Sequence, residues 1–187
     1  MPRLEAEAAD TTQCTVVDGK GACVSLTHTL GTPSGVITEG LGFMWNGGMS
    51  AFDPRPGRAG SLAPGKARPS SMSPTIVFKD GKPFFVVGAP GGTYITPGVL
   101  QAILNVVEFG MTALEAIHAP RFVATSDTIW LTNRIPRAAE RELVRRGYPV
   151  KRSPLTFHFA GVHGIRIVDG KMDGAADPGR DGVAMAA

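Results

Sequence analysis

The stretch Thr-Thr-Gln-Cys-Thr-Val-Val at residues 11–17 decides the fold. Its side chains alternate in character, and a second alternating stretch at residues 22–30 follows the turn Asp-Gly-Lys-Gly at residues 18–21. Two such runs joined by Asp-Gly-type turn residues predict a β-hairpin. Because a strand repeats every two residues, a register that pairs Thr11 with Thr29 separates a mainly polar face from an apolar one. The first face carries Thr11, Gln13, Thr15, Val17, Cys23, Ser25, Thr27 and Thr29, and the second carries Cys14, Val16, Val24, Leu26 and Leu30.

A hydroxyl-rich strand that begins with threonine is of chemical interest if the chain is cut before Thr11. A threonine hydroxyl is a weak nucleophile unless a base lies within hydrogen-bond reach. The free α-amine of an N-terminal residue has a pKa of about 8 and can be that base. The four histidines, at 28, 118, 158 and 163, form no obvious triad. The alternative is that Thr11 and Thr12 only begin a strand, since threonine favours β structure.

Three further motifs decide between these interpretations. They are Ser-Ser-Met-Ser-Pro-Thr at 70–75, Pro-Gly-Gly at 90–92 and Ala-Ala-Asp-Pro at 175–178. In this order and spacing, together with residues 11–18, they make the chain resemble the small subunit of the γ-glutamyltranspeptidase family. The resemblance implies an α+β fold, in which this chain is the catalytic half of an Ntn-hydrolase αββα sandwich. It also implies a precursor that cleaves itself before a threonine.

The resemblance assigns catalytic roles residue by residue. Thr11 matches the nucleophile, so the cleaved bond would be Asp10–Thr11, and Thr29 matches the threonine that supports it from the neighbouring strand. Gly91 and Gly92 match the backbone amides of the oxyanion hole, where glycine lets substrate approach closely and readily adopts positive φ. Each donor aimed at a developing oxyanion commonly contributes about 3 kcal/mol to lowering the barrier.

The expected substrate-binding residues agree with the family only in part. Ser70 and Ser71 match the serine pair that binds the α-carboxylate of a glutamyl substrate. Three other positions differ from the glutamate-binding members of the family. Gly31 stands in place of an Asn and Gly48 in place of a Gln. Ala51 stands in place of the Asp that pairs with the α-ammonium of the substrate. A buried ammonium without its carboxylate costs several kcal/mol. The predicted substrate-binding set is Ser70, Ser71, Gly31, Asn46 and Gly48.

Three functions therefore stay open. The first is a γ-glutamyltranspeptidase-like amidohydrolase or acyltransferase with altered recognition of the glutamate amine. The second is a glutaryl or cephalosporin acylase-like amidase, and the third is an uncleaved, inactive relative that serves as a binding or assembly subunit. The partners implied are the large subunit of the same precursor and a small γ-glutamyl or acyl amide. The third function is disfavoured because a structural role requires none of the catalytic residues together.

Composition limits the remaining possibilities. At 187 residues and 43% hydrophobic, one compact domain is expected, with residues 1–10 as a precursor or linker segment and 11–187 as the catalytic domain. The sequence contains no run of 18 apolar residues, so it predicts no membrane span. The compartment stays open between periplasm, exterior and cytoplasm, since any export signal would lie in the N-terminal half of the precursor.

Charge and ligand patterns exclude several functions. The net charge is +3, and the densest basic group, residues 134–146, has helical spacing with interleaved glutamates. This pattern is typical of a solvated helix and argues against nucleic-acid binding. No Cys/His cluster has metal-ligand spacing, so neither a metal nor another cofactor is expected. Cys14 and Cys23 fall on opposite hairpin faces, which makes a disulfide between them improbable, and they are predicted to be small buried residues.

Patterns elsewhere predict the scaffold. A hairpin is expected at 75–79 and 83–88. Helices are expected at 97–109 with Thr96 as N-cap, at 113–118 behind the capping box Thr112-x-x-Glu115, and at 136–146. Strands are expected near 128–132, 150, 162–168 and 171–175, and residues 31–73 form a long Gly- and Pro-rich loop. His118, His158 and His163 are predicted to be structural. Arg121 is interpreted as an ion pair that ties helix to strand, rather than as a carboxylate-binding residue.

Overall fold

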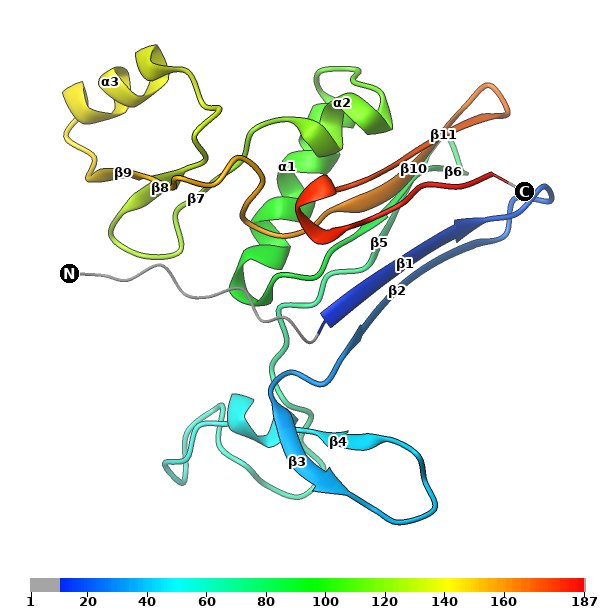
Figure 1. Cartoon of the computed structure of the whole chain (residues 1–187), viewed down its shortest axis with the longest axis vertical. Coiled ribbons are helices and arrows are strands. Elements are labelled where there is room, and N and C mark those ends of the chain that lie inside the picture. The colour runs from blue at the N-terminus through cyan, green and yellow to red at the C-terminus, as the bar shows by residue number, and fades with distance from the viewer. Residues whose placement is uncertain (1–10, 187) are drawn as a thin grey trace.

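The computed structural model describes residues 11–186, so the predicted linker at residues 1–10 lies outside the described residues. A four-stranded antiparallel sheet in the order β11-β10-β6-β5 forms its centre (Figure 1). Its strands are β5 (Thr75–Lys79), β6 (Lys82–Gly88), β10 (His163–Val168) and β11 (Lys171–Ala176). All four follow the predicted pattern closely, because alternating apolar residues and tight turns specify antiparallel neighbours.

The predicted N-terminal hairpin lies on one face of this sheet. Strands β1 (Thr11–Val17) and β2 (Cys23–Thr29) pair antiparallel, with Thr11 opposite Thr29 as expected. The polar face is the inner one, since Ser25 Oγ donates a hydrogen bond to the Val87 carbonyl at 2.9 Å. The apolar face points outward, leaving Val24 and Leu26 53% and 54% exposed.

The prediction that both cysteines are buried was therefore wrong. Cys14 is exposed on the outer face and Cys23 is half-buried, and both are free thiols. For Cys14 the physical reason is that hydroxyl and amide side chains, not apolar ones, fill the space between hairpin and sheet. Cys23 is on the inner face, but it lies opposite Val17 at the turn end of the hairpin. Alternation separates two faces but does not say which one is covered.

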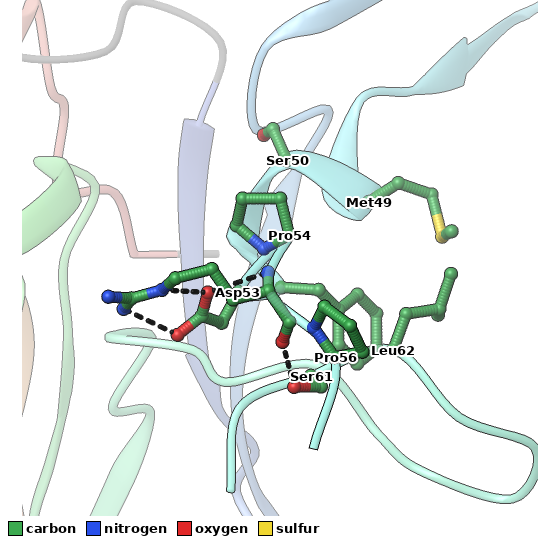
Figure 2. A pocket seen from close by; sticks show the side chains of 9 residues that line it. Met49, Ser50, Asp53, Pro54, Pro56, Ser61 and Leu62 are labelled. Carbon is green, nitrogen blue, oxygen red and sulfur yellow. Dashed lines mark hydrogen bonds and ion pairs between the residues drawn. The ribbon is translucent and has the colours of Figure 1, made fainter. Parts of the chain in front are cut away.

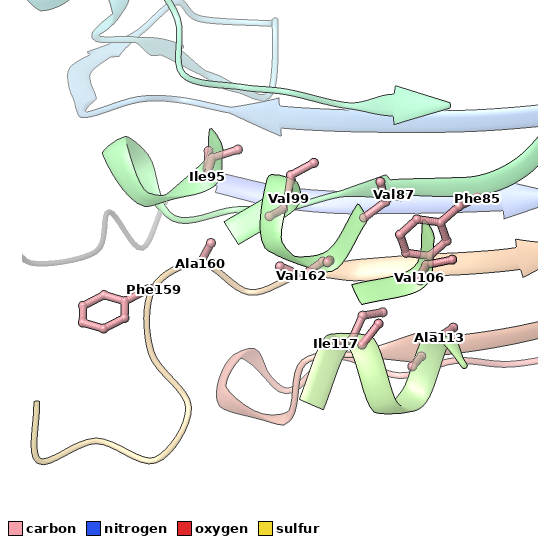
Figure 3. Close-up of a cluster of buried hydrophobic side chains, with 14 of the residues drawn as sticks. Phe85, Val87, Ile95, Val99, Val106, Ala113, Ile117, Phe159, Ala160 and Val162 are labelled. Carbon is pink, nitrogen blue, oxygen red and sulfur yellow. The ribbon is translucent and has the colours of Figure 1, made fainter. Parts of the chain in front are cut away.

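Helices α1 (Ile95–Val107) and α2 (Ala113–His118) cover the opposite face of the sheet. The core lies in this layer, where Phe85 and Val87 of β6 pack against both helices (Figure 3). The capping box of α2 is confirmed, since Thr112 and Glu115 bond each other's backbone amides. α1 begins earlier than predicted, because Thr96 is not its cap and its hydroxyl donates instead to the Ser71 carbonyl at 3.2 Å.

A smaller sheet lies beyond α1. It comprises β7 (Phe122–Val123), β8 (Ile129–Leu131) and β9 (Val150–Arg152), with β8 and β9 parallel. The two-residue strand β7 was not expected from the sequence. Helix α3 (Arg137–Arg145) precedes β9, has no buried residue and carries exposed Arg–Glu pairs, which confirms the predicted solvated helix. The helices described in residues 11–186 include none long and apolar enough to span a membrane.

Residues 32–69 form an arm that extends from this body (Figure 1). The sequence predicts one long loop here, but the structure contains the antiparallel strands β3 (Pro33–Ile37) and β4 (Met44–Asn46) and the short 3-10 helix η1 (Gly48–Ala51). Several large apolar side chains of the arm are exposed, including Ile37, Phe43 and Trp45. Two further 3-10 turns, η2 (Gly92–Tyr94) and η3 (Pro178–Arg180), follow β6 and β11.

Candidate active site

The two threonine hydroxyls predicted to cooperate are in contact. Thr11 Oγ1 and Thr29 Oγ1 are 2.7 Å apart, across the paired ends of β1 and β2. Thr29 Oγ1 also accepts a hydrogen bond from the Gly31 amide at 2.8 Å. Gly31 adopts φ +69°, a conformation that suits glycine. The site thus begins with a bonded chain of Thr11, Thr29 and Gly31.

Gln13 fills space between the hairpin and the sheet. The residue is 7% exposed, and its amide nitrogen donates to Ser25 Oγ at 3.0 Å while Thr27 Oγ1 donates to its oxygen at 2.6 Å. A Cβ on Gly88 would overlap the Gln13 amide, so a larger residue at 88 would displace that side chain. This role of Gln13 was not predicted from the sequence. The feature that could have indicated it is a Gln flanked by hydroxyl residues on one strand face.

The same contacts direct Thr11 toward the end of the sheet where the glycine loop begins. Ser25 lies over Val87, and Gln13, two residue pairs farther along the hairpin, lies over Gly88. Thr11 and Thr29 follow two pairs beyond Gln13, and in β6 the loop 89–92 follows Gly88. Strand pairing advances both elements by about 3.3 Å per residue, so the threonine pair and the glycine loop share one end of the body.

The glycine and serine pairs are joined directly. Ser71 Oγ donates to the Gly92 carbonyl at 2.7 Å, while Ser70 is exposed and accepts from the Met72 amide at 3.1 Å. Gly91 has φ +140° and Gly92 has φ +58°. A Cβ on Gly91 would lie 2.6 Å from Ala160 Cα, which leaves no room for another side chain. The predicted placement of the two motifs at one end of the β5–β6 hairpin is confirmed.

The segment at the base of the arm contacts the residues that directly follow β2. The Gly47 amide donates to the carbonyls of Leu30 and Thr32, at 2.9 and 2.7 Å. Asn46 Oδ1 accepts from the Gly48 amide at 2.9 Å. A Cβ on Gly48 would lie 2.7 Å from Asn46 Oδ1 and 2.9 Å from Arg68 Nε, so the guanidinium of Arg68 occupies the space that a longer residue at 48 would need.

A depression of about 440 Å³ lies farther out in the arm (Figure 2). Arg55 donates to both carboxylate oxygens of Asp53 there, and these hydrogen bonds lower the pKa of Asp53. Met49 and Leu62 line its apolar side. None of the predicted site residues line this depression.

The family is established by sequence comparison. The family model described as gamma-glutamyltranspeptidase matches residues 4–187. The chain belongs to the gamma-glutamyltranspeptidase family. It is 40% identical over 183 residues to the acylase ACY 1 proenzyme of Pseudomonas sp. strain SE83, covering 96% of this chain and 32% of that relative. It is also 36% identical over 180 residues to the glutathione hydrolase proenzyme of Bacillus subtilis strain 168, with 94% and 30% coverage.

The structure of a family member shows the same fold. The gamma-glutamyltranspeptidase from Pseudomonas nitroreducens complexed with L-DON superimposes with a TM-score of 0.81 at 32% identity, covering 94% of this chain and 99% of that one. The expected α+β Ntn-hydrolase fold is therefore confirmed. The chain spans about a third of the length of the curated proenzymes that it matches.

Three histidines of this family member, His118, His158 and His163, lie within the body. His158 stacks on Phe159, with ring centroids 4.4 Å apart, and lies 3.1 Å from the Ser153 hydroxyl. His118 meets Phe157 edge-on. Burial lowers the pKa of His163, which favours its neutral form. These contacts agree with the structural roles expected from the sequence.

Arg121 forms the ion pair that the sequence analysis favoured, and its partner is Asp177. Both side chains are buried in the body. The sequence could not identify this partner, because 56 residues separate the two. The sequence could nevertheless have indicated Asp177 as a candidate, because this residue belongs to the Ala-Ala-Asp-Pro motif.

Proposed function

We propose that this chain is the catalytic part of an amidohydrolase or acyltransferase, with Thr11 as an N-terminal nucleophile released by self-cleavage of the Asp10–Thr11 bond. The observation that carries this proposal is the 2.7 Å contact between the Thr11 and Thr29 hydroxyls, at the end of the body where the glycine loop begins. A strand face alone would not require two bonded hydroxyls, a glycine bonded to one of them and a glycine pair nearby.

The reaction then follows from the groups present. The freed α-amine of Thr11 takes the proton from its own Oγ1, which attacks the amide carbonyl of the substrate. The amides of Gly91 and Gly92 stabilise the oxyanion, and the protonated α-amine gives its proton to the departing amine. The product is an ester on Thr11, which water hydrolyses to the acid, or which an amine converts to a new amide. Thr29 orients the nucleophile through the hydroxyl contact.

The acyl group of the substrate carries a carboxylate in this proposal. Ser71 lies against the glycine loop through its bond to the Gly92 carbonyl, and Ser70 presents an exposed hydroxyl beside it. Ala51 offers no charge to an ammonium, and Arg68 beside Gly48 adds positive charge to the base of the arm. A glutaryl-type acyl group, which lacks the ammonium, is therefore the second candidate substrate beside γ-glutamyl amides. The similarity to an acylase proenzyme supports it.

The remainder of a longer precursor is the proposed partner. Relatives of the chain are proenzymes about three times its length. The outer face of the hairpin exposes Val16, Val24 and Leu26. Exposed apolar strand faces of this kind are usually covered by another layer. The large subunit would supply that layer and complete the αββα sandwich.

The decisive experiment is the intact mass of the chain after co-expression with the N-terminal part of its precursor. We expect loss of residues 1–10, which leaves Thr11 at the terminus, and turnover of γ-glutamyl or glutaryl p-nitroanilide. Thr11→Ala should abolish both cleavage and turnover. Thr12→Ala is the matched control, because Thr12 is the exposed neighbour on the other strand face and should be tolerated.

The result also decides the remaining alternative. A wild-type chain that still begins at Met1 has no free amine on Thr11. That outcome would contradict the nucleophile assignment and support an uncleaved binding or assembly subunit. Cleavage that persists in Thr11→Ala would contradict it equally.

A further inference from the structure

Arg121 is the most enclosed cation of the described residues that form ion pairs. Its side chain is 3% exposed, and its guanidinium has four acceptors. Nη1 donates to the Ile117 carbonyl at 2.7 Å, Nε to the Phe159 carbonyl at 3.1 Å, and Nη2 to the Ala160 carbonyl at 2.9 Å and to the Asp177 carboxylate. A buried charge is tolerated only when it is paired and hydrogen-bonded, and Arg121 meets both conditions.

Two of these acceptors belong to a strained segment. Phe159 and Ala160 adopt φ +66° and +73°, in the left-handed region that side chains other than glycine rarely occupy. Such conformations persist only where the surroundings hold them. Asp177 holds the far side of the segment as well, because its amide donates to the Val162 carbonyl at 3.0 Å. Its second carboxylate oxygen accepts from the Gly179 amide at 2.8 Å.

The strained segment is in direct contact with the proposed oxyanion loop. The Gly161 amide donates to the Pro90 carbonyl at 2.9 Å. Ala160 fits against two glycines, because a Cβ on Gly91 would lie 2.6 Å from Ala160 Cα and one on Gly98 would lie 2.9 Å from Ala160 Cβ. Figure 3 shows the Ala160 side chain pointing toward the first turn of α1. The position of Ala160 therefore defines the space available to Gly91.

We infer that Arg121 and Asp177 are positioning residues for the oxyanion loop, acting through the 159–161 segment. The inference rests on the proposed function, since it takes Gly91 as an oxyanion donor. Neither side chain touches the reacting atoms. Arg121 holds the Ala160 carbonyl, Ala160 packs on Gly91, and the Gly161 amide bonds Pro90. The conformation of Gly91 at φ +140° is thereby imposed from outside the loop.

The test uses the processed enzyme and separates kcat, KM and the melting temperature. In Ala160→Gly, glycine adopts φ +73° without strain, so the melting temperature should stay equal or rise. The methyl group that packs beside Gly91 and Gly98 is lost, and kcat should fall about tenfold with KM within about twofold, because the donors act mainly in the transition state. A purely structural role of the segment could not lower kcat while stability is kept.

Arg121→Lys is the second variant, because lysine keeps the charge beside Asp177 but cannot reach all three carbonyls. Its matched control is Arg152→Lys. Arg152 also pairs with a carboxylate, that of Glu140, and donates to three carbonyls, those of Thr132, Asn133 and Ile135. It lies on β9 beside α3. Both variants should lose stability, but only Arg121→Lys should lose kcat, by tenfold or more.

The outcomes separate this inference from the proposed function. Wild-type kcat in Ala160→Gly overturns the inference, and so does a kcat loss that Arg152→Lys shares. Absence of both cleavage and turnover in the wild-type protein would overturn the proposed function itself, and the inference with it.

Discussion

The body and the arm differ in where they place their apolar side chains. In the body, residues such as Phe85, Val99 and Ile117 are enclosed between the four-stranded sheet and two helices. In the arm, Phe43 and Trp45 stack edge-on against each other, at 5.3 Å between ring centroids, but both are exposed to solvent. The body is therefore stabilised by its own core, whereas the arm has apolar surface that its own chain does not cover.

This difference indicates which part of the molecule depends on a partner. Burial of apolar surface contributes roughly 25 cal/mol per Å², so the exposed side chains of the arm represent stabilisation still to be gained. The outer face of the β1–β2 hairpin belongs with the arm in this respect. The proposed site lies at the junction, with its glycine loop in the body and Asn46 and Gly48 at the base of the arm.

The largest expected effect compares one phenylalanine of each region. Phe85→Ala should lower the free energy of unfolding by about 3–5 kcal/mol, because it leaves a cavity in a close-packed core. Phe43→Ala should change it by less than about 0.5 kcal/mol, as expected for an exposed residue. Urea denaturation followed by circular dichroism measures both. Equal losses would show that the arm is as well packed as the body.

A smaller effect is expected at the base of the arm. Ala51→Asp places a carboxylate where glutamate-binding relatives carry one, so it should favour an acyl group with an α-ammonium. We expect the ratio of kcat/KM for γ-glutamyl over glutaryl p-nitroanilide to rise about tenfold, or about 1.4 kcal/mol. Ala59→Asp, elsewhere in the arm, is the control for added charge. An unchanged ratio in Ala51→Asp would remove residue 51 from substrate recognition.

The smallest effect concerns the body and its pH dependence. Burial lowers the pKa of His163 in the folded state, and the Asp177 carboxylate partly opposes this. As pH falls below about 6.5, the unfolded chain binds the proton more readily than the folded one, so the free energy of unfolding decreases. Above that pH His163 contributes no dependence. In His163→Gln the urea midpoint should fall less between pH 7.5 and 5.5 than it does in the wild type. An equal fall in both proteins would show that His163 does not contribute to the pH dependence of stability.

Local patterns account for the parts of the fold that the sequence predicted. The register of Thr11 opposite Thr29 follows from alternation and an Asp-Gly turn, and helix α2 follows from its capping box. The inward placement of the polar hairpin face could not be predicted, because it depends on what lies above and below the hairpin. The strands of the arm were not predicted, because their segment is rich in glycine and proline. The catalytic and substrate-binding roles of the site residues remain predictions.

Contacts between residues that are far apart in the sequence could not be predicted either. Arg121 was interpreted as one half of an ion pair and Asp177 belongs to the Ala-Ala-Asp-Pro motif, yet nothing in the sequence indicates that the two meet. The same holds for Gly91 and Ala160, whose contact explains why position 91 must be glycine. Such contacts arise from the packing of distant segments, which single-sequence periodicity does not encode.

The two-stranded ladder of β1 and β2 has a consequence for local opening. Among residues 11–186, its backbone forms strand pairs only within the hairpin, and side chains such as those of Gln13 and Ser25 contact the larger sheet. Elements attached in this way can separate as a cooperative unit at a free energy below that of global unfolding. Amide hydrogens of β1 and β2 should therefore exchange with deuterium faster than those of β6 and β10. Thr11 would then sit on a segment that can detach and redock while the body stays folded.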